Sequence, residues 1–213
     1  MKNARVPVAD GVVLEAKLRL PDGAHAAAPV GAALLLHPHP SFGGHMDVWL
    51  LPTIAARLAA DGWASSRINF RGVEGSTGTQ TGGREEHLDA EAALGHLRDA
   101  VGDVPLAVVG WSFGAMIGLR LGRAVERWVG IGTPTRPTPD VPLAGELVPD
   151  DLPPHRTAIV GEHDQFFAPD TVDVLDPHHV VIVPGADHFM FDRDVEVADH
   201  VAAALGDPAG RTP

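Results

Sequence analysis

The feature that most constrains the fold is the pattern G-x-S-x-G at residues 110–114, which follows directly on the apolar run Leu106–Val109. The run predicts a buried strand, and the segment Met116–Leu119 predicts a helix that begins just after the pattern. A chain that passes from strand to helix over so few residues must turn sharply, and Ser112 then projects from the tip of that turn. We expect both glycines of the pattern at positions where a side chain would collide with the turn or with a neighbouring strand.

Short apolar runs alternate with helical periodicity along the rest of the chain. Further strands are predicted at residues 12–20, 32–36, 63–70, 127–131, 157–160 and 180–183, and further helices at 51–59, 84–100 and 192–205. This alternation implies right-handed crossovers, so we predict an α/β fold with a doubly wound, mostly parallel sheet of about seven to eight strands and helices on both faces. Segment 12–20 alternates apolar and polar residues and runs into Pro21-Asp22-Gly23, which predicts an antiparallel edge strand followed by a hairpin connection.

Composition limits the classes of protein to which the chain can belong. Its 213 residues fit a single domain, predicted over residues 1–206, with a disordered tail at 207–213. The formal charge of −12 argues against nucleic acid or an anionic membrane as partner. The absence of cysteine excludes a disulfide, a thiolate nucleophile and a cysteine metal site. No run of apolar residues approaches the length of a membrane span, so we expect a cytoplasmic protein. We expect a small-molecule ester or thioester as its partner, and no cofactor.

Ser112 needs a base and an acid to become a usable nucleophile, and both should lie at the same edge of the sheet. Asp164 lies just past the carboxyl end of the predicted strand 157–160, and His188 lies just past that of strand 180–183. Because the carboxyl ends of parallel strands meet at one edge, we predict a catalytic triad of Ser112, Asp164 and His188. Ester cleavage through an acyl-enzyme on Ser112 is the reaction that this set predicts.

Other carboxylates compete for the role of the acid. Asp187 adjoins His188 but should point away from it along the chain. Asp140, Glu146 and Asp150 follow the predicted strand 127–131, and that position stays open as the alternative. These three lie in the proline-rich segment 132–155, which we interpret as a stiffened connector or, alternatively, as a preformed wall beside the site.

Acyl transfer also needs two N–H groups at the position where negative charge develops on the substrate carbonyl. The N–H of Phe113, directly after the nucleophile, is one candidate. The other is that of His39, because Pro38 and Pro40 on either side of it have no N–H. Trp111, Phe113, Phe166 and Met190 flank the catalytic positions and are candidates for an apolar acyl pocket, although we expect core packing for at least two of these four side chains.

The segments LLHPHPSFGGHMD, INFRGVEGS, VGWSFGAM, GEHDQF and PGADHFMF resemble the α/β-hydrolase superfamily, specifically its small dienelactone-hydrolase-like serine hydrolases without a cap domain. The resemblance extends from about Val12 to Leu205 and implies the α/β-hydrolase fold with a minimal lid. It implies Ser112 as nucleophile, His188 as base and Asp164 as its partner. Two departures stand out: His37-Pro38 replaces the usual His-Gly of the oxyanion loop, and the cysteine nucleophile of dienelactone hydrolases proper is absent.

Alternative functions remain at this point. The same triad could serve an acyl thioesterase or an amide hydrolase, and the fold could carry a non-enzymatic binding module. A more remote alternative is a metal-dependent hydrolase, because His37 and His39 form a His-x-His pair near His163, Asp164 and His188. The metal hypothesis leaves the G-x-S-x-G turn without a purpose.

Overall fold

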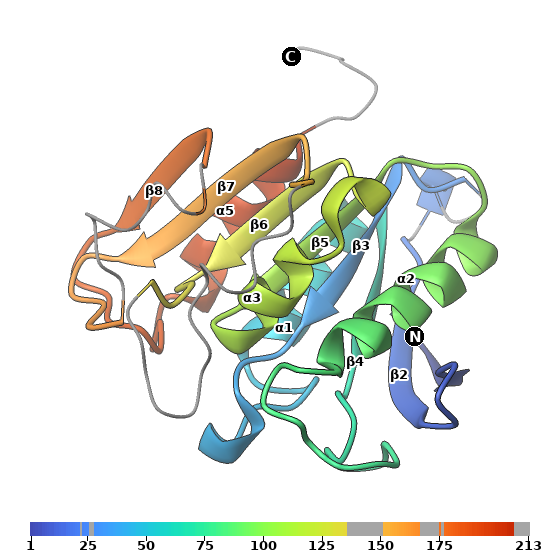
Figure 1. Cartoon of the computed structure of the whole chain (residues 1–213). Helices are drawn as coiled ribbons and strands as arrows, with labels where there is room; N and C mark the ends of the chain where they lie inside the picture. Colours follow the sequence, from blue (N-terminus) through green and yellow to red (C-terminus); the bar gives the residue numbers. More distant parts are fainter. Residues whose placement is uncertain (22, 26–27, 136–150, 167–174, 176, 207–213) are drawn as a thin grey trace.

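A computed structural model describes residues 1–21, 23–25, 28–135, 151–166, 175 and 177–206. In this part of the chain eight strands form one sheet in the order β1-β2-β4-β3-β5-β6-β7-β8 (Figure 1). The strands are β1 (Lys2–Pro7), β2 (Val13–Arg19), β3 (Gly31–Leu36), β4 (Trp63–Ile68), β5 (Leu106–Trp111), β6 (Arg127–Ile131), β7 (His155–Gly161) and β8 (His179–Val183). The helices are α1 (Leu50–Ala60), α2 (Glu86–Val101), α3 (Phe113–Leu119) and α5 (Asp194–Leu205), with short 3-10 turns at 23–25, 40–42 and 122–124.

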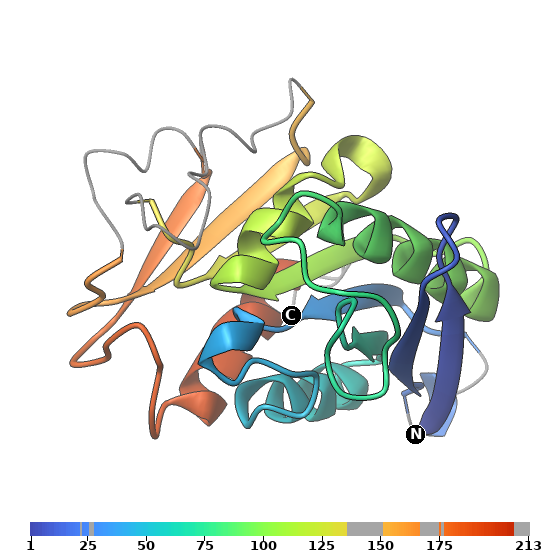
Figure 2. The ribbon, with the colours of Figure 1, turned by 60° about the horizontal axis from the view of Figure 1, so that its bottom comes forward.

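The predicted α/β class with a mostly parallel, doubly wound sheet is confirmed. Strands β4, β3, β5, β6, β7 and β8 pair in parallel, whereas β1 and β2 are antiparallel to their neighbours. The prediction for segment 12–20 was right about the antiparallel pairing and wrong in two respects: β2 lies inside the sheet between β1 and β4, and the chain then crosses to β3 instead of forming a hairpin. Figure 2 shows β1 and β2 at one end of the sheet and β7 and β8 at the other.

Two apolar layers cover the sheet. Helices α2 and α3 lie on one face, and α1 and α5 lie on the other (Figure 1). Alternate residues of β3 serve the two layers: Leu34 and Leu36 pack with α2 and α3, and Leu35 packs with α1 and α5. Burial on both faces favours apolar side chains at successive positions, which explains the continuous run in β3. This rigid sheet fixes the places at which the loops after β5, β7 and β8 begin.

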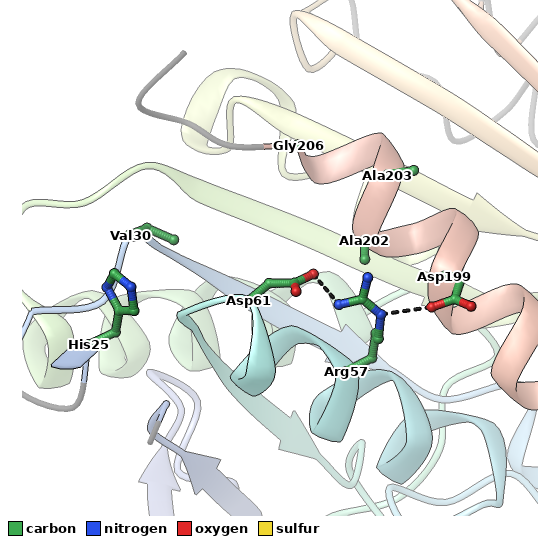
Figure 3. A pocket seen from close by; sticks show the side chains of 8 residues that line it. All are labelled: His25, Val30, Arg57, Asp61, Asp199, Ala202, Ala203 and Gly206. Carbon is green, nitrogen blue, oxygen red and sulfur yellow. Dashed lines mark hydrogen bonds and ion pairs between the residues drawn. The ribbon is translucent and has the colours of Figure 1, made fainter. Parts of the chain in front are cut away.

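The carboxyl ends of the parallel strands form one edge of the sheet, and a hollow of about 400 Å³ lies at the opposite end, where β3 and β4 begin. The lining residues are His25, Val30, Arg57, Asp61, Asp199, Ala202, Ala203 and Gly206 (Figure 3). The Arg57 guanidinium pairs with Asp61 and Asp199, so its charge is already balanced. Because the hollow lies where the strands begin, it is remote from the turn that carries Ser112 at the carboxyl end of β5. None of the described helices combines the length and the hydropathy needed to cross a bilayer.

Candidate active site

The turn between β5 and α3 holds Ser112 in a conformation that L-residues rarely adopt, with φ 52° and ψ −113°. The Ser112 N–H donates to Ile131 O at 2.8 Å, which ties the turn to the end of β6. A Cβ on Gly110 would lie 2.4 Å from the backbone of Ala115, and a Cβ on Gly114 would lie 2.4 Å from Leu36 O. The expected steric need for both glycines is confirmed. Such backbone strain persists only where the surrounding structure imposes it, as here.

Three side chains from three loops meet at this turn. His188 Nε2 lies 2.9 Å from Ser112 Oγ, and His188 Nδ1 lies 3.0 Å from Asp164 Oδ2 and 3.1 Å from Asp164 Oδ1. The Asp164 side chain is fully buried, and that of His188 is 8% exposed. A carboxylate can only accept, so Nδ1 carries the proton and the neutral imidazole presents the lone pair of Nε2 to the serine hydroxyl. The arrangement can take a proton from Ser112 Oγ without further movement.

The loops after β7 and β8 are bonded to one another, which fixes the acid relative to the base. The His163 N–H donates to Ala186 O at 2.8 Å. A Cβ on Gly161 would lie 2.5 Å from the same carbonyl oxygen, so the two loops approach as closely as a glycine permits. The Phe166 N–H donates to Asp164 Oδ1 at 2.9 Å and orients the carboxylate toward His188.

The carboxylate of Asp164 occupies the space in front of the end of β6. Gly132, with φ +52°, lies there, and a Cβ at this position would be 3.1 Å from Asp164 Oδ2 and 3.2 Å from His188 Nδ1. Asp187 is turned to its own loop, since its Oδ1 accepts the Phe189 N–H at 2.9 Å. The alternative acids at positions 140, 146 and 150 lie outside the described residues.

Phe113 and His39, the residues whose N–H groups are the candidate oxyanion donors, both lie beside the serine turn. Phe113 is the first residue of α3, where a backbone N–H has no acceptor within the helix. The His39 ring lies 5.0 Å from the Phe113 ring, so the loop after β3 packs directly against the turn. The His39 ring also accepts the Ser41 N–H at Nδ1 at 3.1 Å, which orders the loop around it. The assignment of the two N–H groups to an oxyanion remains a prediction.

His37, part of the candidate metal set, serves the backbone instead. Its Nε2 accepts the Phe70 N–H at 3.1 Å, and its Nδ1 lies 2.7 Å from Pro38 O, to which it donates. The bond at Nε2 joins the loop after β3 to the loop after β4, and the bond at Nδ1 lies within the loop after β3. Burial lowers the pKa of His37 from 6.5 to about 4, although the bond to Pro38 O acts in the opposite direction. Among the described residues no group of three or more histidine or acidic side chains is arranged to hold a metal ion.

The buried neutral His37 makes the stability of the fold dependent on pH. The unfolded chain binds a proton at this residue below about pH 6.5, whereas the folded chain binds it only below about pH 4. The free energy of unfolding therefore falls as the pH decreases from 6.5 to 4. Between about pH 7.5 and about pH 5 we expect this residue to cost about 2 kcal/mol of stability. Urea unfolding of the wild type and of His37→Gln at both pH values isolates the contribution of His37 to the free energy of unfolding. An equal decrease of this free energy in the two proteins would contradict the prediction.

Of the four predicted pocket residues, the structure leaves Phe166 at the site, with its ring 4.5 Å from the His188 ring. Trp111 and Met190 pack in the layer under α1 and α5, Phe113 packs in the opposite layer, and all three are at most 2% exposed. These three side chains therefore belong to the core. Three exposed aromatic side chains were missed, namely Trp49, Phe189 and Phe191, of which Phe189 contacts the His188 ring. Only the position of Phe189, next to His188, offered a signal in the sequence.

Comparisons with known proteins agree with this architecture. The sequence profile of the family described as alpha/beta hydrolase fold matches residues 38–140. An uncharacterized protein of Rickettsia prowazekii is 41% identical over 98 residues, which are 44% of this chain and 39% of that protein. The chain therefore matches well under half the length of this relative.

Solved structures resemble the chain over nearly its whole length. An α/β serine hydrolase without lid from Xanthomonas campestris superposes with a TM-score of 0.83 at 24% identity, over 100% of this chain and 96% of that one. A serine hydrolase homologue from Coxiella burnetii gives 0.81 at 23% identity, over 96% and 97%. A protein of unknown function from Agrobacterium tumefaciens gives 0.77 at 26% identity, over 96% and 94%. The likeness establishes the fold.

Proposed function

We propose that the chain is a serine hydrolase of the α/β-hydrolase superfamily that cleaves a small carboxylic ester through an acyl-enzyme on Ser112, and the family match over residues 38–140 and the shared fold support this proposal. The observation that carries the proposal is the hydrogen-bonded series from Ser112 Oγ through the His188 ring to the Asp164 carboxylate. A strained serine, a buried imidazole and a buried carboxylate have no shared structural purpose that would explain their alignment. Nucleophilic catalysis explains it.

The reaction begins when His188 Nε2 takes the proton of Ser112 and Oγ forms a bond to the ester carbonyl carbon. The resulting oxyanion accepts hydrogen bonds from the N–H groups of Phe113 and His39. The bond from carbon to the leaving oxygen then breaks, and the protonated imidazole gives its proton to that oxygen, so the alcohol departs. Water, deprotonated by the same imidazole, attacks the acyl group and releases the carboxylic acid and free Ser112.

Asp164 acts in both halves of this cycle without taking the proton itself. Its carboxylate holds the proton on Nδ1, which keeps Nε2 free to accept, and it stabilises the imidazolium that forms in each half-reaction. The bond from the Phe166 N–H keeps the carboxylate in the required orientation. Acid and base are therefore preorganised before a substrate arrives.

A fluorophosphonate probe tests the nucleophile directly. We expect the folded protein to gain the mass of one phosphonyl group, located on Ser112 by peptide mapping, because the other buried serines lack an adjacent base. Ser66 is a suitable internal control, since it is 1% exposed and its Oγ has no hydrogen-bond partner in the described structure. Absence of an adduct on Ser112 would support a binding module instead, and loss of ester turnover on chelation would support the metal alternative.

A further inference from the structure

The loop that carries the base turns its side chains alternately inward and outward. His188 is 6% exposed, Phe189 is 36%, Met190 is fully buried and Phe191 is 59%. Met190, with φ 55°, is anchored in the layer under α1 and α5, and this anchor directs the two phenylalanines on either side of it to the surface. Solvent-exposed aromatic rings so close to a catalytic base need an explanation, because burial would stabilise the fold.

The two phenylalanines continue into an ordered series of rings. The Phe189 ring lies 5.7 Å from the Phe191 ring at 26°, and the Phe191 ring lies 5.0 Å from the Trp49 ring at 18°, so the three are stacked. We call these three side chains the aromatic row. One end of the row meets the His188 ring at 5.6 Å, and the other meets the buried ring of Trp111, next to the nucleophile, at 5.2 Å.

Three charged groups beside the aromatic row are engaged in local structure. Asp187 accepts the Phe189 N–H, Asp194 is bonded to Thr53, and Arg193 pairs with Glu196 at 3.5 Å. The three stacked rings thus offer an apolar surface that is continuous with the candidate active site, and the nearby carboxylates of Asp187, Asp192 and Asp194 make this region unfavourable for an anionic group. A neutral apolar group of a substrate fits it better than a charged one.

The chemistry of the imidazole decides which part of a substrate reaches this surface. The protonated Nε2 must lie beside the leaving oxygen to donate to it, so the alcohol part of an ester lies on the His188 side, whereas the carbonyl oxygen points to the Phe113 side. We propose that the aromatic row is the subsite for the alcohol part, and that the enzyme prefers esters of aryl-bearing or similarly large apolar alcohols. This inference rests on the proposed serine-hydrolase function.

Two pairs of esters test the position of the subsite. 2-Phenylethyl acetate and ethyl acetate differ by a phenyl ring on the alcohol side and form the same acetyl-enzyme. Ethyl 3-phenylpropanoate and ethyl propanoate differ by the same ring on the acyl side. We expect kcat/KM to favour 2-phenylethyl acetate by about tenfold or more in the wild type, and Phe191→Ala to reduce that preference to about threefold or less. The ratio within the acyl-side pair should not change with the substitution.

Phe191 suits the experiment because it is 59% exposed and lies beyond contact with His188, so its replacement should leave the fold intact. Val195→Ala, at an exposed apolar position of α5 outside the row, is the matched control and should keep the wild-type ratio. Fluorophosphonate labelling of each variant separates the two proposals. An adduct on Ser112 with an unchanged alcohol-side ratio overturns the subsite alone, and no adduct in the wild type overturns the serine mechanism and the subsite with it.

Other occupants of the row give different results. A change confined to the acyl-side ratio would place the acyl group there and overturn the assignment. An effect seen only above the solubility limit of the ester would indicate binding to a lipid-like surface. A shift in oligomeric state on size-exclusion chromatography with unchanged ratios would indicate a second copy of the chain, and both of these results would also overturn it.

Discussion

Replacing Ser112 with alanine is expected to lower kcat for ester hydrolysis by about a million-fold, because the substitution removes the only atom that bonds to the acyl group. Water bound in the same site could still be activated by His188, but it would lack the fixed position of Oγ. Alanine carries the same Cβ at φ 52°, so the backbone strain of the turn is unchanged. The free energy of unfolding should therefore stay close to that of the wild type.

Turnover of 2-phenylethyl acetate and urea unfolding, measured on the same preparations, check this prediction. Ser66→Ala is the matched control, because Ser66 is a buried serine of β4 whose hydroxyl has no hydrogen-bond partner in the described structure. This control should keep full turnover. Turnover in Ser112→Ala above about one per cent of the wild-type rate would show that the nucleophile lies elsewhere.

The sheet could be predicted largely from the sequence because several of its parallel strands, which are covered on both faces, are continuous apolar runs. Leu106–Trp111 and Gly31–Leu36 are such runs. Strand β1 could not be found in this way, since Val6 is the only buried residue of Lys2–Pro7. An edge strand of this kind is held by its backbone pairing with β2, which leaves almost no trace in the hydrophobic pattern.

The three candidate catalytic residues could be located for a topological reason. Each follows a predicted strand, and the carboxyl ends of parallel strands share one edge, so residue type and strand position together were informative. The role of His37 lay beyond this reasoning. Its acceptor bond from the Phe70 N–H joins loops that are 33 residues apart, and only the tertiary structure shows that burial has removed this ring from metal or acid–base chemistry.

Candidate substrate contacts were the least predictable part. Adjacency in sequence to a catalytic residue says nothing about the direction of a side chain: Trp111 and Met190 point into the core, and Phe189 and Phe191 point outward. Trp49 comes from the start of α1, far along the chain from the loop that it stacks against. Contacts of this type depend on how α1 and the loop after β8 pack together, which local patterns do not encode.

Asp164→Asn is expected to reduce kcat by about ten-thousand-fold, through a change of tautomer. The Phe166 N–H donates to Oδ1 in the wild type, so the asparagine should keep its carbonyl oxygen at that position and place its amide nitrogen where Oδ2 lies, 3.0 Å from His188 Nδ1. An amide N–H donor facing Nδ1 forces the imidazole proton onto Nε2. The ring then points a proton at Ser112 Oγ and can no longer accept one.

Turnover and the rate of fluorophosphonate labelling should fall together in this variant, because both reactions need His188 to take the serine proton. Asp187→Asn is the matched control: it alters a carboxylate next to His188 whose Oδ1 accepts a backbone N–H, and an asparagine carbonyl can replace that bond. This control should keep most of the turnover. Asp140→Asn should keep most of the turnover as well. If Asp140→Asn abolished turnover and Asp164→Asn did not, the catalytic acid would follow β6 instead of β7. The hydrogen bond between Asp164 and His188 would then have a structural role only.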